Sequence, residues 1–193
     1  MKVLCLAICE GKKILAIEHE LSSFSYFSRG SIQEGMNFFV QTVVERTPNG
    51  QRATVQQDNY TGHVYVSQDG LASVIVTDAE YPQRVAFSVA GKCLDEFKSK
   101  FPRKDVTPET TSQRYPELRQ HLEKAQDPQS NDPFMRVQRE LDETKVILHK
   151  TMDSLLQRGE KLDDLVQRSD QLSAQSKMFY KTAKKTNACC TYV

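Results

Sequence analysis

The chain has 193 residues, with 26 lysines and arginines against 25 aspartates and glutamates and a formal net charge of +1. No basic stripe rises above that balance, so nothing in the sequence supports nucleic-acid binding. No apolar run reaches the ~18 residues of a membrane-spanning helix. Phosphate-binding GxxxxGK[ST] loops and Gly-x-Ser-x-Gly elbows are absent, and the histidines have no metal-ligand spacing: His19, His63, His121 and His149.

The chain begins with a pattern typical of a β-hairpin. Residues 3–9 form a short apolar run, Glu10 and Gly11 interrupt it, and residues 14–17 are again apolar. The first strand is expected to be buried on both faces. A signal peptide is the competing interpretation, but the apolar run is too short and Glu10 closes it without a small-residue cleavage pattern.

A helix is predicted from Ser31 to about Arg46. Ser31 can cap its N-terminus, and Glu34 lies three residues later, as in a capping box. The apolar residues then recur on one face of the helix: Ile32, Met36, Phe39, Val40, Val43 and Val44. Phe38 and Phe39 are adjacent and cannot both face one core, so Phe38 is either a groove residue or an aromatic tucked under a loop.

Three strands and two helices follow. The strands are predicted at residues 53–55, 62–66 and 71–76, and Asp69-Gly70 joins the last two. The helices are predicted at residues 81–101 and 116–125, with these residues facing the core: Val85, Val89, Cys93, Phe97, Leu118 and Leu122. The order ββα, βββ, αα fits one compact domain of about 125 residues. Cys5, Cys9 and Cys93 lie in apolar patterns and are interpreted as reduced core residues.

The composition changes near residue 130. All prolines and all but one glycine precede Phe134, and the proline-rich residues 102–133 are expected to be an extended linker apart from the short helix. Beyond it, apolar or small residues recur at alternating steps of three and four, which predicts one helix of about fifty residues that packs against other helices. The stripe positions are Phe134, Val137, Leu141, Thr144, Leu148, Thr151, Leu155, Leu162, Leu165, Ser169, Leu172, Ser176, Phe179, Ala183 and Thr186.

Arg158 occupies the middle of this stripe, where the pattern requires an apolar residue. One interpretation is a side chain that covers the seam with its stem and keeps its guanidinium in water. The other is a polar layer inside a multi-helix bundle, where a buried charge that must be satisfied fixes the register of the helices.

The chain ends in Cys189-Cys190-Thr191-Tyr192-Val193. A cysteine four residues from the C-terminus fits a prenylation box, and its neighbour Cys189 fits a palmitoylation site. Two lipid chains anchor a protein stably whereas one does so only marginally, and Lys181, Lys184 and Lys185 could add attraction to anionic lipid. The alternatives are incidental surface thiols or a metal-binding or disulfide pair. Tyr192 and Val193 depart from the usual box and leave the choice of isoprenoid open.

The segment Leu-Leu-Gln-Arg-Gly-Glu-Lys-Leu-Asp-Asp-Leu at 155–165, with Asp142-Glu-Thr-Lys upstream and Phe179 downstream, resembles the centre of an R-SNARE motif of the synaptobrevin type. The resemblance implies that Arg158 is the ionic-layer arginine. It would be coordinated by a glutamine from each of three Q-SNARE helices in a parallel four-helix bundle that draws two membranes together.

The N-terminal region is similar to a longin domain: an α+β, profilin-like fold with a five-stranded antiparallel sheet between helices. The sequences at 22–27 and 78–87 resemble the lipid-anchored Ykt-type longin R-SNAREs in particular. That resemblance implies an autoinhibitory domain whose groove, including Phe38 and Phe39, holds the SNARE segment and the lipid. It also implies palmitate on Cys189 and a prenyl group, expected to be farnesyl, on Cys190.

The resulting prediction is a longin domain at 1–126, a linker at 127–133, an R-SNARE motif at 134–188 and a lipidation box at 189–193. Its function would be vesicle docking and fusion in ER-to-Golgi and related transport. The protein would be found in the cytosol and on the cytoplasmic face of Golgi, vesicle, endosomal or vacuolar membranes. No catalytic residue, metal or cofactor is expected; self-palmitoylation promoted by the longin domain has no supporting residues. The rivals are a lipid-anchored homotypic coiled-coil scaffold and a lipid-dependent, acyltransferase-like longin protein.

Overall fold

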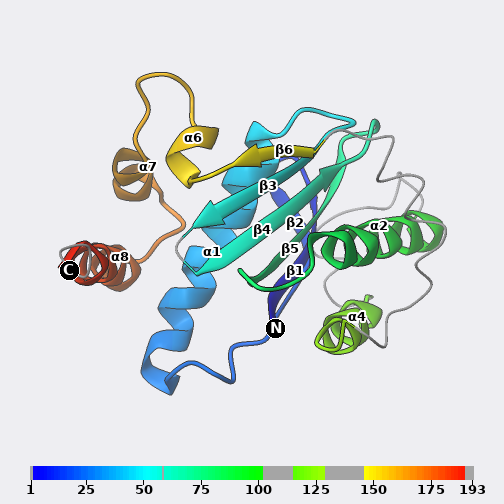
Figure 1. Ribbon diagram of the computed structural model, residues 1–193, viewed down its shortest axis with the longest axis horizontal. Helices are drawn as coiled ribbons and strands as arrows, with labels where there is room; N and C mark the ends of the chain where they lie inside the picture. The colour runs from blue at the N-terminus through cyan, green and yellow to red at the C-terminus, as the bar shows by residue number, and fades with distance from the viewer. Residues whose placement is uncertain (1, 58, 102–114, 129–145, 190–193) are drawn as a thin grey trace.

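The computed structural model describes residues 2–57, 59–101, 115–128 and 146–189 (Figure 1). Its centre is a six-stranded sheet in the order β2-β1-β5-β4-β3-β6. All pairs among the first five strands are antiparallel, and only β6 runs parallel to its neighbour β3. The strands are β1 Val3–Glu10, β2 Lys13–His19, β3 Arg52–Gln57, β4 Tyr60–Val66, β5 Leu71–Asp78 and β6 Val146–His149.

Helices cover both faces of this sheet, as Figure 1 shows. The N-terminal helices are α1 Tyr26–Arg46, α2 Gln83–Lys100 and α4 Glu117–Ala125. One core lies between the sheet and α2 and α4, with Phe97, Leu94 and Leu118 fully enclosed, and the other lies between the sheet and α1 around Val40 and Val43. The expected α+β class and the five-stranded antiparallel sheet between helices are therefore confirmed.

The N-terminal hairpin agrees with the sequence pattern. Seven of the eight residues of β1 are buried, because β2 and β5 flank the strand and helices cover both of its faces. The turn before β5 places Gly70 at a φ of 87°, a left-handed conformation that glycine adopts without steric cost. The pattern of apolar residues and turn glycines was therefore sufficient to predict this part of the sheet.

The predicted start of the first helix is wrong. The helix begins at Tyr26 with Ser25 as its N-cap, and Ser31 lies inside it, buried. Arg29 stabilises the additional turns, because its guanidinium donates hydrogen bonds to the carbonyl oxygens of Phe24 (3.1 Å) and Ser22 (3.1 Å) in the preceding loop. Those bonds fix the loop against the helix, an arrangement that the capping pattern at Ser31 does not indicate.

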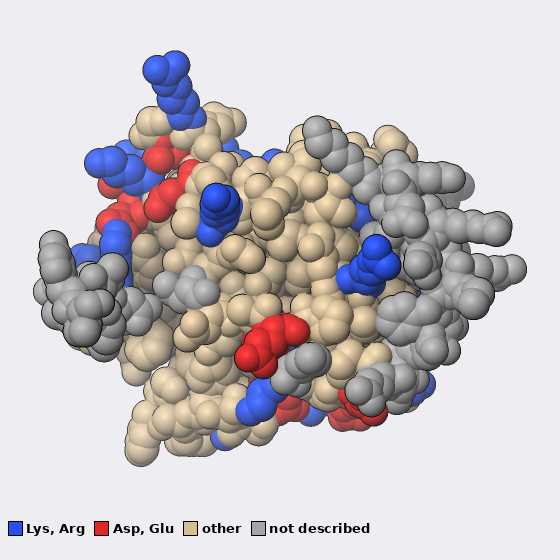
Figure 2. All heavy atoms as spheres, in the orientation of Figure 1, with Lys and Arg blue, Asp and Glu red and all other residues tan. Residues whose placement is uncertain are grey.

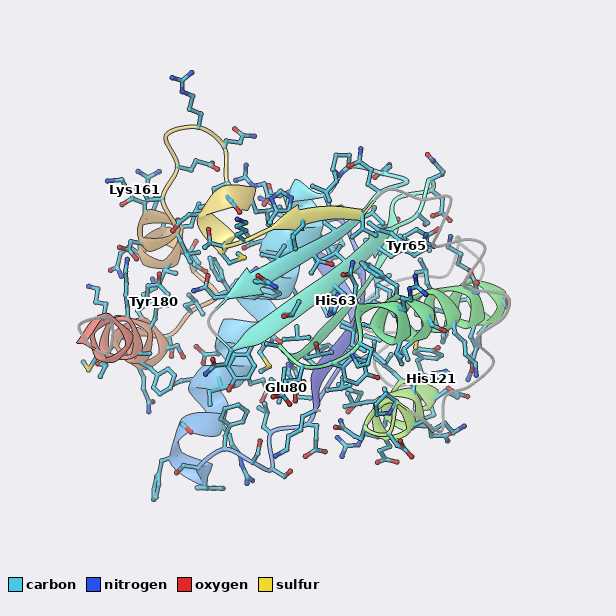
Figure 3. The ribbon with its side chains drawn as sticks, viewed as in Figure 1. His63, Tyr65, Glu80, His121, Lys161 and Tyr180 are labelled. Atoms are coloured by element: carbon cyan, nitrogen blue, oxygen red, sulfur yellow. The ribbon has the colours of Figure 1, made fainter. Side chains whose placement is uncertain are left out.

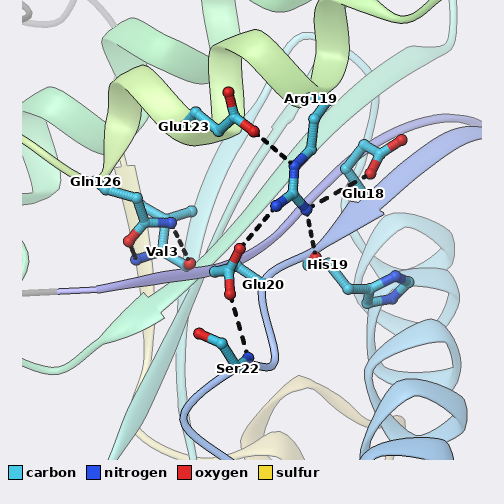
Figure 4. Close-up of polar contacts among 8 residues, drawn as sticks. All are labelled: Val3, Glu18, His19, Glu20, Ser22, Arg119, Glu123 and Gln126. Atoms are coloured by element: carbon cyan, nitrogen blue, oxygen red, sulfur yellow. Dashed lines mark hydrogen bonds and ion pairs between the residues drawn. The ribbon is translucent and has the colours of Figure 1, made fainter.

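The short helix α4 closes the N-terminal fold (Figure 4). Arg119 donates to the backbone oxygen of His19 at 3.0 Å and to the Glu20 carboxylate at 2.9 Å, and Glu123 pairs with the same guanidinium at 3.0 Å. The Gln126 side chain bonds both backbone groups of Val3, at 2.7 and 3.1 Å. The chain is thus tied to β1 and β2 immediately before the linker region.

The C-terminal region is helical only in part, and the prediction of a single long helix is wrong. Within the described residues it consists of β6 followed by α6 Met152–Leu155, α7 Leu162–Arg168 and α8 Ala174–Cys189. Two causes are visible: β6 pairs with the open edge of β3, and Gly159 sits in the α6–α7 turn at a φ of 93°. An amphipathic stripe is stabilised by whatever apolar surface it packs on, and here that surface is a bent face of the chain's own fold.

The interior cysteines are reduced and buried, as predicted. Burial raises the pKa of the Cys9 thiol to about 12 and raises the pKa values of Cys5 and Cys93 further. At neutral pH these groups are therefore thiols, which are poor nucleophiles.

Candidate functional site

The C-terminal segment, here residues 146–189, folds back over α1 and the β3 edge of the sheet (Figure 1). It begins with β6, in which Val146 to His149 pair with Arg52 to Val55. The helix α6 then packs against β3, and α8 packs alongside α1. The segment therefore covers one face and one edge of the N-terminal fold.

The segment enters the core that lies between α1 and the sheet. Five of its side chains belong to that apolar cluster, together with Val40, Val43 and Val44 of α1. They are Met152, Leu155, Leu162, Val166 and Leu172, all at most 8% exposed. Burial of this kind contributes ~25 cal/mol per Å² of apolar surface, so the closed arrangement is stabilised by the same effect that would drive helix-bundle formation.

Several stripe positions are buried in this arrangement and others are not. Leu155, Leu162, Leu172 and Ser176 are buried, Leu165, Ser169 and Ala183 are half-buried, and Leu148, Thr151 and Phe179 are exposed. Arg158 is exposed in the turn between α6 and α7. The central arginine thus lies in water in this conformation, while apolar stripe residues on both sides of it contact the fold.

The remaining predicted positions are not described. Phe134, Val137, Leu141, Thr144 and Cys190 lie outside the described residues. Thr186 and Cys189 lie in the last turns of α8, where only the backbone is described.

Two buried contacts were missed at the sequence level: Met152 and Val166. Each follows a stripe position by one residue, so each lies beside the stripe that the heptad spacing selects. Val166 is apolar and lies four residues after Leu162, a spacing that places both on one helix face. That pair could have indicated the face that α7 turns toward the fold.

An apolar cavity of about 550 Å³ lies between α1, the ends of β3 and β4, and the C-terminal segment. Phe38 and Phe39, the two residues that the longin resemblance assigns to a groove, both line it. Phe39 fits over Gly62, where a Cβ atom would lie 2.4 Å from its ring. The other main lining residues are Phe24, Ile32, Met36, Tyr60, Val76, Phe179, Tyr180 and Ala183.

Polar contacts hold the segment at the α6–α7 and α7–α8 turns. Arg46 at the end of α1 pairs with Glu160 at 3.0 Å, and Glu34 accepts the Ser173 backbone N–H at 2.8 Å. The pKa of the Glu34 carboxyl is lowered by that N–H and by the hydroxyls of Ser176 and Ser173. The pKa of Glu160 is lowered first by the Gln157 N–H and then by Arg46.

Within the segment, α7 and α8 are tied to each other through Asp163. Its carboxylate accepts the Tyr180 hydroxyl at 2.9 Å and the Lys184 ammonium at 2.6 and 2.8 Å, and these two side chains lower its pKa. Tyr180 lies on the side of α8 that borders the rest of the segment (Figure 3).

Other kinds of site find no support among the residues that the structure describes. No group of histidines, cysteines and carboxylates there is placed to bind a metal ion, and no helix there is long and apolar enough to cross a membrane. Figure 2 shows acidic and basic side chains interspersed on the face it presents, without a continuous basic stripe among its described atoms. The closed segment and its cavity are therefore the principal candidate site.

Comparison with known proteins assigns both parts of the chain. Residues 21–122 match the family model Longin, a regulated-SNARE-like domain, and residues 133–190 match the Synaptobrevin model. The synaptobrevin homolog ykt6 of Schizosaccharomyces pombe is 57% identical over 178 residues, 92% of this chain and 90% of that protein. The YKT6 proteins of Debaryomyces hansenii (47%; 98% of each chain) and Saccharomyces cerevisiae (46%; 93% and 92%) are similar along nearly their whole lengths.

The Longin model matches most of the N-terminal fold, and the Synaptobrevin model matches the C-terminal segment. The SNARE proteins are a nonenzymatic class. The chain therefore belongs to the synaptobrevin family, as a YKT6-type R-SNARE of vesicle transport with an N-terminal longin domain.

Proposed function

We propose that the R-SNARE segment, residues 134–188, zippers with three Q-SNARE helices into a parallel four-helix bundle, and that the longin domain holds it inactive in the closed form described above. Arg158 would supply the ionic layer, and three glutamine side chains would satisfy its donors. Zippering from the membrane-distal end would draw two membranes together. The process is mechanical and includes no enzymatic step.

One observation supports this proposal most directly: the closed form buries Leu155, Leu162 and Leu172. In a bundle the same side chains would face three partner helices, so closure and assembly compete for one surface. Arg158 is exposed when the segment is closed, so opening need not expose a buried charge. The two states thus differ in what covers the stripe and in whether the guanidinium is dry.

We propose further that Cys190 carries an isoprenoid and Cys189 a palmitoyl group. The cavity of about 550 Å³ has the size of a small-molecule site, which spans about 300–1,000 Å³. Ala183 lines the cavity and precedes Cys189 by six residues of α8, or about 9 Å at ~1.5 Å per residue. A lipid on the following residue would be within reach, so the isoprenoid could occupy the cavity in the cytosol and the bilayer after opening.

This scheme predicts two populations, one in the cytosol and one on the cytoplasmic face of Golgi, vesicle, endosomal or vacuolar membranes. Cys190→Ser should leave the protein wholly soluble in cells, because the palmitoyl group on Cys189 would be added only after the isoprenoid on Cys190 has brought the protein to a membrane. Cys189→Ser should leave only weak and transient membrane association, since one lipid chain binds marginally. If the double variant fractionated with membranes as the wild type does, the lipid part of the proposal would fail.

The competition between closure and assembly can be tested with two opposite variants. Met152→Gln with Val166→Gln removes two side chains that are 2% exposed in the closed form but lie beside the stripe. Each of the two substitutions should make closure less favourable by about 2 kcal/mol. The double variant should assemble with cognate Q-SNAREs at least about tenfold faster than the wild type and give a complex of unchanged heat resistance.

Arg158→Ala should do the reverse. The side chain is exposed in the closed form, so closure should be unaffected, whereas the heat resistance of the assembled complex should fall. Self-association of the full chain without partners would favour the homotypic scaffold instead. Equal assembly rates for the wild type and the Met152→Gln, Val166→Gln variant would contradict the autoinhibitory role.

A further inference from the structure

The first turn of α1 exposes two adjacent aromatic side chains for which the SNARE function gives no role. Tyr26 is 80% exposed and Phe27 is 87% exposed. Their rings meet edge to face, with centroids 5.9 Å apart. Among the residues that the structure describes, they are the most exposed large apolar side chains.

A second exposed apolar pair lies on α8, the helix beside α1. Met178 is 68% exposed and Phe179 is 43% exposed. Phe179 itself lines the cavity, and so do Phe24 and Ser28, which flank the Tyr26–Phe27 pair in the sequence. The exposed apolar groups thus lie on elements that border the cavity, and α1 and α8 lie side by side (Figure 1).

The two stretches that bear these side chains are basic. Residues 21–30 contain Arg29 and no acidic residue, and residues 174–189 contain no acidic residue and these lysines: Lys177, Lys181, Lys184 and Lys185. Two carboxylates beside these stretches are engaged, since Asp163 binds Lys184 and Glu34 accepts the Ser173 N–H. Aromatic rings among cationic side chains match the chemistry of an anionic membrane surface.

We propose that Tyr26, Phe27, Met178 and Phe179 form a membrane-docking face of the closed protein, which binds an anionic bilayer before the SNARE segment opens. The rings would enter the headgroup region, and Lys181, whose side chain is exposed, would contact anionic headgroups. The cavity mouth would then face the bilayer, so a lipid held inside could pass into it without crossing water. A second copy of this chain is a poorer occupant, because a symmetric pairing would bring the basic stretches of the two copies together.

The full-length chain without lipid modification provides the test, in vesicles of phosphatidylcholine alone or with 30% phosphatidylserine as the probe. The wild type should sediment with the anionic vesicles and remain in the supernatant with the neutral ones. Tyr26→Ser with Phe27→Ser should lower the partition coefficient by about tenfold. Lys181→Glu should lower it by about fivefold or more. Lys13→Glu, at the first residue of β2, should leave it unchanged.

The chain contains no tryptophan, so a single introduced indole reports its own position. Phe27→Trp should retain binding, and its emission should shift to shorter wavelength and be quenched by brominated lipid in anionic vesicles. Leu148→Trp is the matched control, since Leu148 is also exposed (57%) but lies on β6; its emission should not change.

Three results would overturn the proposal. Binding that is indifferent to the aromatic substitutions would remove the face, and an unshifted indole emission from the Phe27→Trp variant in the presence of bound vesicles would mean that another surface docks. Concentration-dependent dimerisation that Phe27→Ser abolishes, without vesicle binding, would assign the face to a second copy. Because the protein in this test bears no lipid and meets no Q-SNARE, its failure would leave the proposed SNARE function untouched.

Discussion

The Glu34 carboxylate of α1 accepts a hydrogen bond of 2.8 Å from the backbone N–H of Ser173, a residue 139 positions later in the chain. Ser173 immediately precedes α8, and its hydroxyl accepts the Ser176 N–H at 3.1 Å. The first turn of α8 thus receives one acceptor from its own segment and one from the longin domain. A negative charge at a helix N-terminus is stabilising, so Glu34 links the formation of α8 to closure.

Removing that acceptor should loosen the closed form. Glu34→Ala is expected to cost about 1 kcal/mol, the usual effect of a lost N-terminal cap, and to raise amide exchange in α8 about fivefold. Glu45→Ala is the matched control, because Glu45 lies on the same helix but pairs with Lys12. Equal exchange in the two variants would show that the bond contributes nothing to closure.

The same contact predicts weaker closure in acid. The pKa of Glu34 in the closed form is below the ordinary value of 4.5 because the Ser173 N–H and neighbouring hydroxyls bind the ionised carboxylate. A lowered pKa contributes stability that is complete above the ordinary value and is lost as the pH falls through the lowered one. Exchange in α8, relative to that in β1, should therefore rise below about pH 4.5.

Glu34→Ala should reduce that relative rise, since the titrating group is gone. His63 supplies a separate acid effect on the whole fold, because burial lowers its pKa to about 4. The unfolded chain binds a proton at this residue more readily than the folded one, so the fold loses stability as the pH falls from 6.5 toward 4. His63 lies in the sheet (Figure 3), away from α8. A ratio of α8 to β1 exchange that stays constant with pH would contradict the role assigned to Glu34.

The longin part could be predicted from the sequence because its elements are determined locally. Short apolar runs and turn glycines place β1, β2 and β5, and periodic apolar residues place α2 and α4. The start of α1 could not be predicted, because it depends on Arg29 reaching back to loop carbonyls. A contact of that kind has no repeating pattern in the sequence.

The structure of the C-terminal segment could not be predicted from the sequence in the same way. Its heptad spacing describes the surface that pairs with other helices, and that spacing is satisfied only when such helices are present. In their absence Leu155, Leu162 and Leu172 still find apolar neighbours, but the chain must bend to reach them. This bending forms the site that includes Met152, Val166 and the cavity. The site depends on the C-terminal segment contacting the longin domain, so the pattern within either segment alone could not reveal it.

Gly159 is the point at which the two conformations conflict most clearly. Its φ of 93° in the closed turn favours glycine, whereas a continuous helix would favour alanine by about 1 kcal/mol. Gly159→Ala should therefore strain the closed form by about 1 kcal/mol or more and stabilise the helical one. The combined change of about 2 kcal/mol should speed assembly with Q-SNAREs on the order of thirtyfold.

Gly91→Ala is the control for that substitution. Gly91 lies in α2, where an added Cβ meets nothing within 4 Å and φ is not in the left-handed region. This variant should raise the thermal stability of the longin domain slightly and leave assembly unchanged. If Gly159→Ala assembled at the wild-type rate, the α6–α7 turn would not be part of the barrier to opening.

The shape of the cavity depends on Gly62, because a Cβ there would lie 2.4 Å from Cε1 and 2.5 Å from Cζ of Phe39. Gly62→Ala should push the Phe39 ring into the cavity that it lines, with a loss of stability of about 1–3 kcal/mol, the typical cost of overpacking. A fluorescent isoprenoid analogue should bind the unlipidated variant at least about tenfold more weakly. Phe39→Leu in the same chain should relieve the clash and restore most of the binding, because leucine is smaller. If Gly62→Ala alone bound the analogue as the wild type does, the isoprenoid would have to be held elsewhere, and the closed segment would be retained by its protein contacts alone.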